Sequence, residues 1–198
     1  MRKTLAGLFA VALLSGCGAT GTGLRPSPSP SQAPSGSPSA LPTPSSSSSP
    51  TVAPSPTPPA GFGLASITGG AVSDSTVTAV RVGQQSGYDR FVIEFGGGVP
   101  NFSVTPQDNT TFTRSPRGDQ VTLEGTTGVL VIVHSVTNWT SYSGPTAFQP
   151  GYPYLRQALQ VENFEGYQQW ALGVKGTVYV RVMTLGSPNR LVVDVYGA

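Results

Sequence analysis

The sequence predicts an all-β domain, a small β-sandwich of two antiparallel sheets with about eight strands. From Thr76 to the C-terminus, short runs of β-branched and aromatic residues alternate with polar residues at a period of two. Gly, Pro, Asn or Asp lies at or near most ends of these runs, as is typical of turns. Many short strands in one small domain favour a sandwich or barrel over a parallel sheet with crossover helices.

An export signal precedes the predicted domain. After the basic Arg2 and Lys3, residues 5–14 form an uninterrupted apolar run. This run is too short to cross a bilayer core of about 30 Å, but it has the length of a signal-peptide core. It ends in Leu-Ser-Gly-Cys at residues 14–17, which resembles a bacterial lipobox. The resemblance implies a signal peptide over residues 1–16 and a membrane anchor made by lipid on Cys17. The alternative is an ordinary secretory signal with an unrelated cysteine.

A proline- and serine-rich segment follows the predicted lipid site. Residues 25–60 contain 12 prolines and 12 serines, with no charge beyond Arg25. Such a segment has too little apolar surface to offset the entropy lost on ordering, so it predicts a disordered, locally polyproline-like spacer. We therefore divide the chain into a signal peptide (1–16), a lipidated cysteine with its tether (17–66) and a β-sandwich domain (67–198).

The charge and cysteine content restrict the partners of this domain. Cys17 is the single cysteine of the chain, so the exported domain has no disulfide and depends on its core for stability. The chain has 11 basic and 9 acidic residues, and loss of Arg2 and Lys3 with the signal would leave the two signs equal. A near-neutral domain lacks the basic surface of a nucleic-acid-binding protein, so we expect no nucleic-acid partner.

Eight segments have the pattern of strands. One further stretch, residues 154–164, permits a short helix instead, because Leu155, Ala158 and Leu159 are spaced to share a helical face. The eight segments read VTAVRVG (77–83), RFVIEFG (90–96), FSVTP (102–106), QVTLEG (120–125), VLVIVHSV (129–136), YQQWALGV (167–174), VYVRVMTL (178–185) and RLVVDVYG (190–197).

Two of these segments repeat one pattern, an arginine followed four residues later by an acid. In a strand, residues 91, 93 and 95 would share an apolar face, and residues 191, 193 and 195 would do the same. Arg90 with Glu94, and Arg190 with Asp194, would lie on the outer faces. If the strands were antiparallel neighbours, Arg90 could oppose Asp194 and Glu94 could oppose Arg190, and these pairs would mark the register. All four residues are secondary candidates for binding, and the two arginines could meet an acidic wall polymer.

The same segments carry a family resemblance. RFVIEF (90–95), VENFEGYQQWALGV (161–174) and VYVRVMTLGSPNRLVVDVYG (178–197) resemble the AMIN-like domain of exported bacterial lipoproteins, a relative of the AMIN envelope-targeting domain. The resemblance implies a sandwich of two small sheets with an internal pseudo-repeat and an envelope-binding role. It implies no catalytic residues, because AMIN modules are accessory parts of larger systems.

The residues themselves also argue against an enzyme. A catalytic zinc needs about three protein ligands, and the domain offers one histidine, His134, and no cysteine. A Ser-His-Asp hydrolase would need His134 as its base, and no Gly-x-Ser-x-Gly elbow is present. Glu162 and Glu165 could form a pair of glycosidase carboxylates or be two solvated acids. We therefore predict no enzyme activity, no metal and no cofactor.

An aromatic loop is the best candidate for binding. It is interleaved with Gly, Pro, Ser and Thr, a composition that suits a glycan or a peptidoglycan stem if the rings are exposed. The alternative is that the rings fold inward and plug one end of the sandwich. The aromatic residues are Trp139, Tyr142, Phe148, Tyr152 and Tyr154.

Two functions remain open at this point. The first is a non-catalytic, lipid-anchored envelope protein that binds peptidoglycan, another wall polymer or an exported envelope protein. The alternative is a solute-binding lipoprotein that carries a small ligand in an apolar sandwich cavity. Both place the domain outside the cytoplasmic membrane, facing the cell wall or periplasm.

Overall fold

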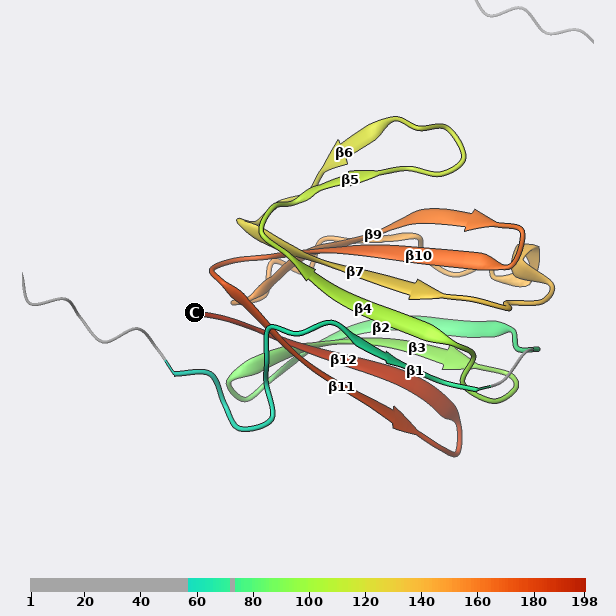
Figure 1. Cartoon of the computed structure of the whole chain (residues 1–198), viewed down its shortest axis with the longest axis horizontal. Coiled ribbons are helices and arrows are strands. Elements are labelled where there is room, and N and C mark those ends of the chain that lie inside the picture. The colour runs from blue at the N-terminus through green and yellow to red at the C-terminus, as the bar shows by residue number, and fades with distance from the viewer. Residues whose placement is uncertain (1–56, 72–73) are drawn as a thin grey trace, which may run out of the picture. The chain divides into compact units, whose positions relative to one another are not determined.

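Two antiparallel sheets packed face to face form the body of the domain in the computed structural model, which describes residues 57–71 and 74–198 (Figure 1). One sheet has six strands in the order β1-β4-β7-β10-β9-β8, and the other has four in the order β11-β12-β3-β2. A small hairpin, β5–β6, lies outside the six-stranded sheet (Figure 1). The all-β sandwich prediction is confirmed, with twelve strands in the described part of the chain in place of about eight.

The strand bounds are as follows. The six-stranded sheet contains β1 (Ile67–Gly69), β4 (Phe102–Gln107), β7 (Thr127–Val133), β8 (Ala147–Phe148), β9 (Leu155–Phe164) and β10 (Tyr167–Val174). The four-stranded sheet contains β2 (Val77–Gln85), β3 (Tyr88–Phe95), β11 (Val178–Leu185) and β12 (Asn189–Gly197), and the hairpin contains β5 (Thr111–Thr113) and β6 (Gln120–Thr122). One 3-10 turn, η1, spans Trp139–Ser141 in the part of the chain that the structure describes. Among the residues described, no helix has the length and apolarity needed to cross a membrane.

The core lies between the two sheets. The predicted inward faces of the repeated strands are confirmed, because residues 91, 93 and 95 of β3 and 191, 193 and 195 of β12 are all buried. Trp170 of β10 is fully buried opposite them, with its ring 5.5 Å from that of Phe91. Full burial of each large apolar side chain contributes about 1.5–3 kcal/mol, so a domain without a disulfide can rely on this core.

The predicted short helix near residues 154–164 is wrong, because this segment is strand β9. β9 pairs with β10 along its length, but the register shifts twice, between Gln169 and Trp170 and between Gly173 and Val174. Each shift adds a residue on β9 and interrupts its strict alternation. The buried residues of β9 are therefore Leu155, Ala158 and Val161, a spacing of three that imitates a helical face.

The segment before β1 closes one side of the sandwich. Gly63 exchanges two backbone hydrogen bonds with Val180 on the free edge of β11, at 2.9 and 2.8 Å. The ring of Phe62 lies over the four-stranded sheet, 4.8 Å from the Arg181 guanidinium. These contacts fall within the range predicted as tether (17–66). The predicted signal peptide and Cys17 lie outside the described residues.

The predicted pairing of the repeated strands is confirmed. β3 and β12 are antiparallel neighbours, with Arg90 opposite Asp194 and Glu94 opposite Arg190. Asp194 is fully buried, and its carboxylate accepts hydrogen bonds from Arg90 Nε at 2.7 Å and from Arg181 Nη2 at 2.7 Å. The hydrogen bond with Asp194 raises the pKa of Arg90 above its ordinary value.

The second expected pair differs from the prediction. Glu94 binds Arg81 of β2 at 2.7 Å, and Arg190 Nε donates to the carbonyl oxygen of Pro188. Arg81 lies on β2, which borders β3 on the side away from β12. Glu94 therefore pairs with Arg81 and not with Arg190, the residue directly opposite it on β12. The hydrogen bond from Arg81 lowers the pKa of the Glu94 carboxyl.

These two ion pairs should differ in their effect on stability. We expect Asp194→Asn to lower the free energy of unfolding by about 3–5 kcal/mol, because it leaves two partly buried guanidinium groups without their counter-charge. Glu94→Gln should cost much less, because the Arg81 side chain is 60% exposed and water screens the pair. Urea unfolding of both variants measures the difference, and equal losses would contradict a structural role for Asp194.

Candidate functional site

The hairpin formed by β9 and β10 presents two aromatic rings at its tip. Its turn consists of Glu165 and Gly166, which both have positive φ values, 48° and 83°. A two-residue turn of this kind matches the twist of an antiparallel pair. Phe164 and Tyr167 flank the turn as a cross-strand pair, and 38% and 44% of their surfaces are exposed. The turn therefore holds the aromatic side chains of Phe164 and Tyr167 in solvent, side by side at the tip of the hairpin.

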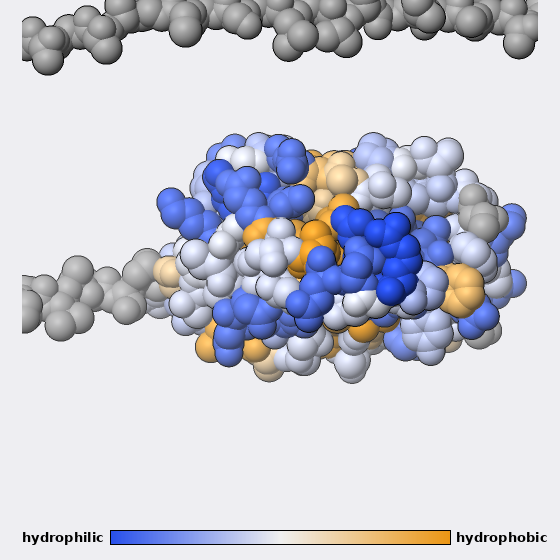
Figure 2. All heavy atoms as spheres, turned by 90° about the horizontal axis from the view of Figure 1, so that it is seen from above, coloured by the Kyte–Doolittle hydropathy of each residue, from blue (hydrophilic) through white to orange (hydrophobic). Residues whose placement is uncertain are grey.

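Two further rings adjoin this pair. The Trp139 ring in η1 is 5.9 Å from the Phe164 ring, and the His134 ring is 4.6 Å from the Tyr167 ring. We call these four residues the aromatic lip. Phe164 and Tyr167 are two of the four exposed large hydrophobic residues of the described chain. Elsewhere the face that carries β5 and β6 is largely hydrophilic, with small separate hydrophobic patches (Figure 2).

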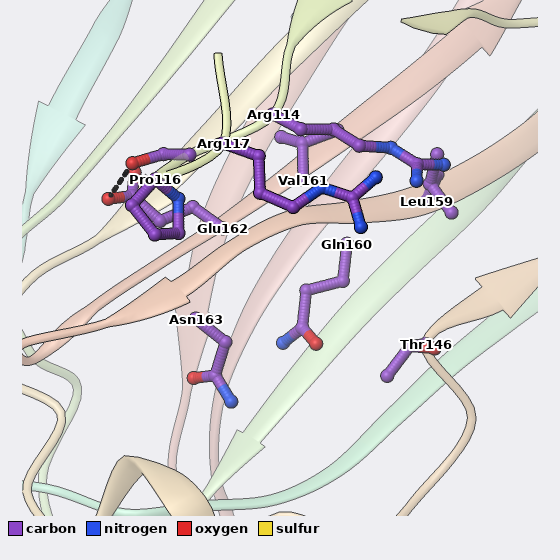
Figure 3. Close-up of a pocket in the computed structure, with 10 residues that line it drawn as sticks. Arg114, Pro116, Arg117, Thr146, Leu159, Gln160, Val161, Glu162 and Asn163 are labelled. Carbon is purple, nitrogen blue, oxygen red and sulfur yellow. Dashed lines mark hydrogen bonds between the residues drawn. The ribbon is translucent and has the colours of Figure 1, made fainter. Parts of the chain in front are cut away.

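A hollow of about 370 Å³ lies between the β5–β6 loop and strand β9. Residues 114–117 of the loop line one side, residues 159–163 of β9 line the other, and Thr146 completes the wall (Figure 3). The backbone N–H of Ser115 donates to the carbonyl oxygen of Val161 at 3.0 Å, so the loop is attached to the edge of β9. The volume is within the range of small-molecule sites.

Three polar atoms on the walls of this hollow are buried and have no hydrogen-bond partner. They are Arg114 Nε, Gln160 Nε2 and Asn163 Oδ1. In the described part of the chain five side-chain atoms are in this condition, so most of them gather at one place. A buried polar group without a partner costs about 1–3 kcal/mol, and such groups are rare in proteins. Their concentration marks the hollow as the leading candidate site.

The acids near the hollow are already engaged. Asp119 accepts hydrogen bonds from Arg117 Nε at 3.0 Å and Nη2 at 3.3 Å, which lower the pKa of its carboxyl. Arg114 Nε is 4.0 Å from the same carboxylate, so two guanidinium groups share one acid. Glu162 accepts hydrogen bonds from the Ser115 hydroxyl and from the Gln169 amide. The hollow thus offers polar groups of both kinds without a strong excess of charge.

Asn163 joins the hollow to the aromatic lip. Its side chain lines the hollow, and its Nδ2 donates to the backbone carbonyl of Trp139 at 3.0 Å. Phe164 follows Asn163 directly in β9. The lip and the hollow therefore adjoin each other at Asn163, and we call the two together the lip-and-hollow surface. In chemical terms it combines flat apolar rings with hydrogen-bond donors and acceptors and has the character of a binding site.

The predicted aromatic residues are divided between this surface and the core. Trp139 belongs to the lip, although it also packs against the core. Tyr142, Phe148, Tyr152 and Tyr154 are partly buried and pack against the main core, as the inward-folded alternative expects. Burial raises the pKa of the Tyr142 hydroxyl and that of Tyr154. A role of these four rings in ligand binding stays a prediction.

The repeated-strand residues lie elsewhere. Arg90, Glu94, Arg190 and Asp194 belong to the four-stranded sheet, on the other side of the sandwich from β5 and β6 (Figure 1). Among the described residues, no group of three or more His, Cys, Asp or Glu side chains could hold a metal ion. His134 lies instead against the Tyr167 ring.

Most residues of the hollow were missed by the sequence analysis. Arg114, Arg117, Gln160 and Asn163 stand in ordinary polar surroundings in the sequence, and only the fold brings them together. The lip carried a usable signal. Phe-Glu-Gly-Tyr at residues 164–167 places two aromatics around a two-residue turn, which indicates a hairpin if both flanks are read as strands. The apolar residues at 155, 158 and 159 are spaced as on a helix, and this spacing obscured the strand that leads into the turn.

Asp89 secures the loop that carries Trp139. It is fully buried, and its Oδ2 accepts hydrogen bonds from the backbone N–H groups of Tyr154 and Leu155, each at 2.8 Å. These bonds tie the end of the 139–154 loop and the start of β9 to β3.

We expect Asp89→Ala to lower the free energy of unfolding by about 2–3 kcal/mol, because two buried N–H groups lose a charged acceptor. Urea unfolding measures this loss, and amide hydrogen exchange of residues 152–156 should rise with it. Asp108→Ala, at an exposed position, is the control and should leave the unfolding midpoint unchanged. Unchanged exchange at residues 152–156 in Asp89→Ala would contradict the anchoring role.

Comparison with known proteins identifies the type of domain. A family model, the AMIN-like domain, matches residues 75–197. The match spans strands β2 to β12 and thus includes both sheets except for the edge strand β1, together with the lip-and-hollow surface. No curated protein matches the chain.

Proposed function

The chain belongs to the AMIN-like domain family, and on this basis we propose that it is a lipid-anchored envelope protein that binds peptidoglycan through the lip-and-hollow surface. AMIN-like domains are found in exported envelope proteins, where their role is generally non-enzymatic. Peptidoglycan as the ligand, lipid on Cys17 as the anchor and this surface as the site are our proposals.

One observation carries the proposal of a site: three unpaired polar atoms around a 370 Å³ hollow, beside exposed aromatic rings. Peptidoglycan consists of sugar rings with apolar faces and of many hydroxyl and amide groups. Such a polymer can place a ring face on Phe164 or Tyr167 while its polar groups pair with the hollow. A flat aromatic surface without the hollow would offer contact to the sugar rings but no partners for the hydroxyl and amide groups.

The solute-carrier alternative gains less support. The space between the sheets is filled by large, fully buried side chains, including Trp170, Phe91 and Leu172. An apolar ligand would need to displace well-packed atoms there, which is costly. The lip-and-hollow surface, in contrast, is open at the outside of the domain and suits a polymer that passes across it.

The anchor and tether belong to the same proposal. Residues 18–56, outside the described part, would link lipid on Cys17 to the domain. At about 3.1 Å per residue in polyproline conformation, this length reaches on the order of 100 Å when extended. Two or more acyl chains on one cysteine would hold the protein stably at a membrane. The domain could then reach wall polymer away from the membrane surface.

Binding to purified sacculi tests the ligand and the site together. The full chain carrying Cys17→Ser stays unlipidated and should sediment with peptidoglycan. The double variant Phe164→Ser with Tyr167→Ser should bind about tenfold more weakly, because it removes both ring faces of the hairpin tip.

The matched control uses the other two exposed large apolar residues, Leu64→Ser with Leu185→Ser, and should bind like the parent. If the parent stays in the supernatant, the peptidoglycan proposal is wrong and a protein partner is favoured. If the lip variant binds as well as the parent, the assigned surface is wrong.

The anchor has its own test. In a bacterial host with lipoprotein processing, the unaltered chain should partition with membranes and label with radioactive palmitate. Cys17→Ser should abolish the labelling and release the protein from the membrane fraction, because no other cysteine is present. Membrane retention of the Cys17→Ser variant would contradict lipid anchoring.

A further inference from the structure

We propose that the hollow of the lip-and-hollow surface binds a secondary amide group and so distinguishes N-acylated ligands from those without an amide. This inference rests on the proposed function, because it names the group of the wall polymer that enters the hollow. It follows from the kind and position of the unpaired polar atoms on the walls.

Two of these atoms are donors. Gln160 Nε2 and Arg114 Nε each carry N–H groups, and neither has an acceptor in the protein. Asp119 is the nearest acid to Arg114 Nε, at 4.0 Å, and it already accepts hydrogen bonds from Arg117 Nε and Nη2. Arg114 stands on the loop side of the hollow and Gln160 on the β9 side (Figure 3), so after rotation of these side chains a carbonyl oxygen in the hollow would find a donor on either side.

The third atom is an acceptor, and its identity follows from its neighbour. The amide of Asn163 faces the backbone carbonyl of Trp139 at 3.0 Å, and a carbonyl can only accept a hydrogen bond. Nδ2 must therefore point at Trp139, which leaves Oδ1 as the free atom. An N–H group in the hollow would pair with this oxygen.

A secondary amide supplies both partners at once. It has one C=O acceptor and one N–H donor that point in opposite directions, so it can bridge donors and an acceptor on different walls. Leu159 and Val161 also line the hollow and offer apolar contact to the carbon of an acyl group. The three unpaired atoms are nearly covered by neighbouring atoms, so pairing requires side-chain rotations. Arg114 and Gln160 are partly exposed and can make them.

Other common groups fit less well. A carboxylate or phosphate only accepts hydrogen bonds, so it would leave Asn163 Oδ1 unpaired and would lie close to the Glu162 carboxylate. A free amine could pair with Asn163 but would face the guanidinium groups of Arg114 and Arg117. A lone hydroxyl presents a single oxygen and cannot reach both sides of the hollow in the way an amide does.

The amide has two sources in a wall polymer, the acetamido group of an amino sugar and the peptide bond of a stem peptide. The test therefore uses three soluble probes with the full chain carrying Cys17→Ser. They are a tetramer of N-acetylglucosamine, a glucose tetramer with the same linkage and no acetamido group, and an N-acetylated tetrapeptide. NMR titration gives a Kd for each.

We expect the N-acetylglucosamine tetramer to bind at least about tenfold more tightly than the glucose tetramer. Gln160→Glu exchanges the Nε2 donor for an acceptor at constant shape and should remove this preference. Gln84→Glu makes the same change at an exposed position of β2 and should retain it. Arg114→Met is a second variant that removes a donor while keeping the backbone bond of residue 114 to Asp119, and should weaken the preference.

Each outcome has one meaning. Tight binding of the tetrapeptide with sensitivity to Gln160→Glu also supports the amide inference and identifies the stem as its source. Equal affinity for the two sugar tetramers without tetrapeptide binding overturns the inference, as does a preference that survives both hollow variants. Because sacculus binding is measured separately, sedimentation with sacculi combined with equal tetramer affinities and no tetrapeptide binding would reject the amide inference and leave the proposed function standing.

Discussion

The register between β3 and β12 depends on one buried carboxylate. Asp194 has no exposure to solvent, and the guanidinium groups of Arg90 and Arg181 hold it from the two neighbouring strands. A slip of one residue would turn Asp194 toward the apolar core and leave both arginines without their partner. The alternation of inward and outward residues in the four-stranded sheet is therefore set at this point, and with it the faces of β3 and β12 that form the core.

The candidate site depends on the same register through Asp89. Because neighbouring residues of a strand point to opposite faces, Arg90 on the outer face places Asp89 on the inner one. There Asp89 binds the N–H groups of Tyr154 and Leu155 and positions the beginning of β9. The other end of β9 carries Asn163 and Phe164, which belong to the hollow and the lip. A packing constraint in one sheet thus positions a surface formed by the other.

The irregularity of β9 is what makes that surface possible. At the register shift, the consecutive residues Val161 and Glu162 both face the β5–β6 hairpin. Val161 packs in a small cluster with Phe112 and Leu123 beneath the hairpin, and Glu162 binds Ser115 of the β5–β6 loop. The loop is therefore held over the edge of β9 with room left between them. In a regular strand, Val161 and Glu162 would point to opposite faces of the sheet, and the hairpin would lose the contact of one of these two side chains. Binding surfaces often arise where a rigid sheet supports such an exception.

The eight segments with clear alternation all became strands, and the expected antiparallel pairing of the two repeated segments is present. The strands that escaped prediction are the short β1, β5 and β8, and β9, whose bulges disrupt its period. The sequence suggested Trp139 as a binding residue, which stays a prediction, but it did not connect Trp139 with its neighbours in the lip and the hollow. Phe164 and Tyr167 meet across a turn, and Arg114 meets Gln160 across a long sequence separation, so their proximity is a tertiary property.

The sequence by itself determined the fold class, the two inward faces of the repeated strands and the family, because these depend on local alternation and on motifs within single strands. The tertiary structure alone decided which acid pairs with which arginine, which aromatic rings face solvent and where unpaired polar atoms gather. Those properties depend on the sheet order and on bulges. Neither leaves a strong periodic signal in the chain, because each arises from contacts between residues that are distant in sequence.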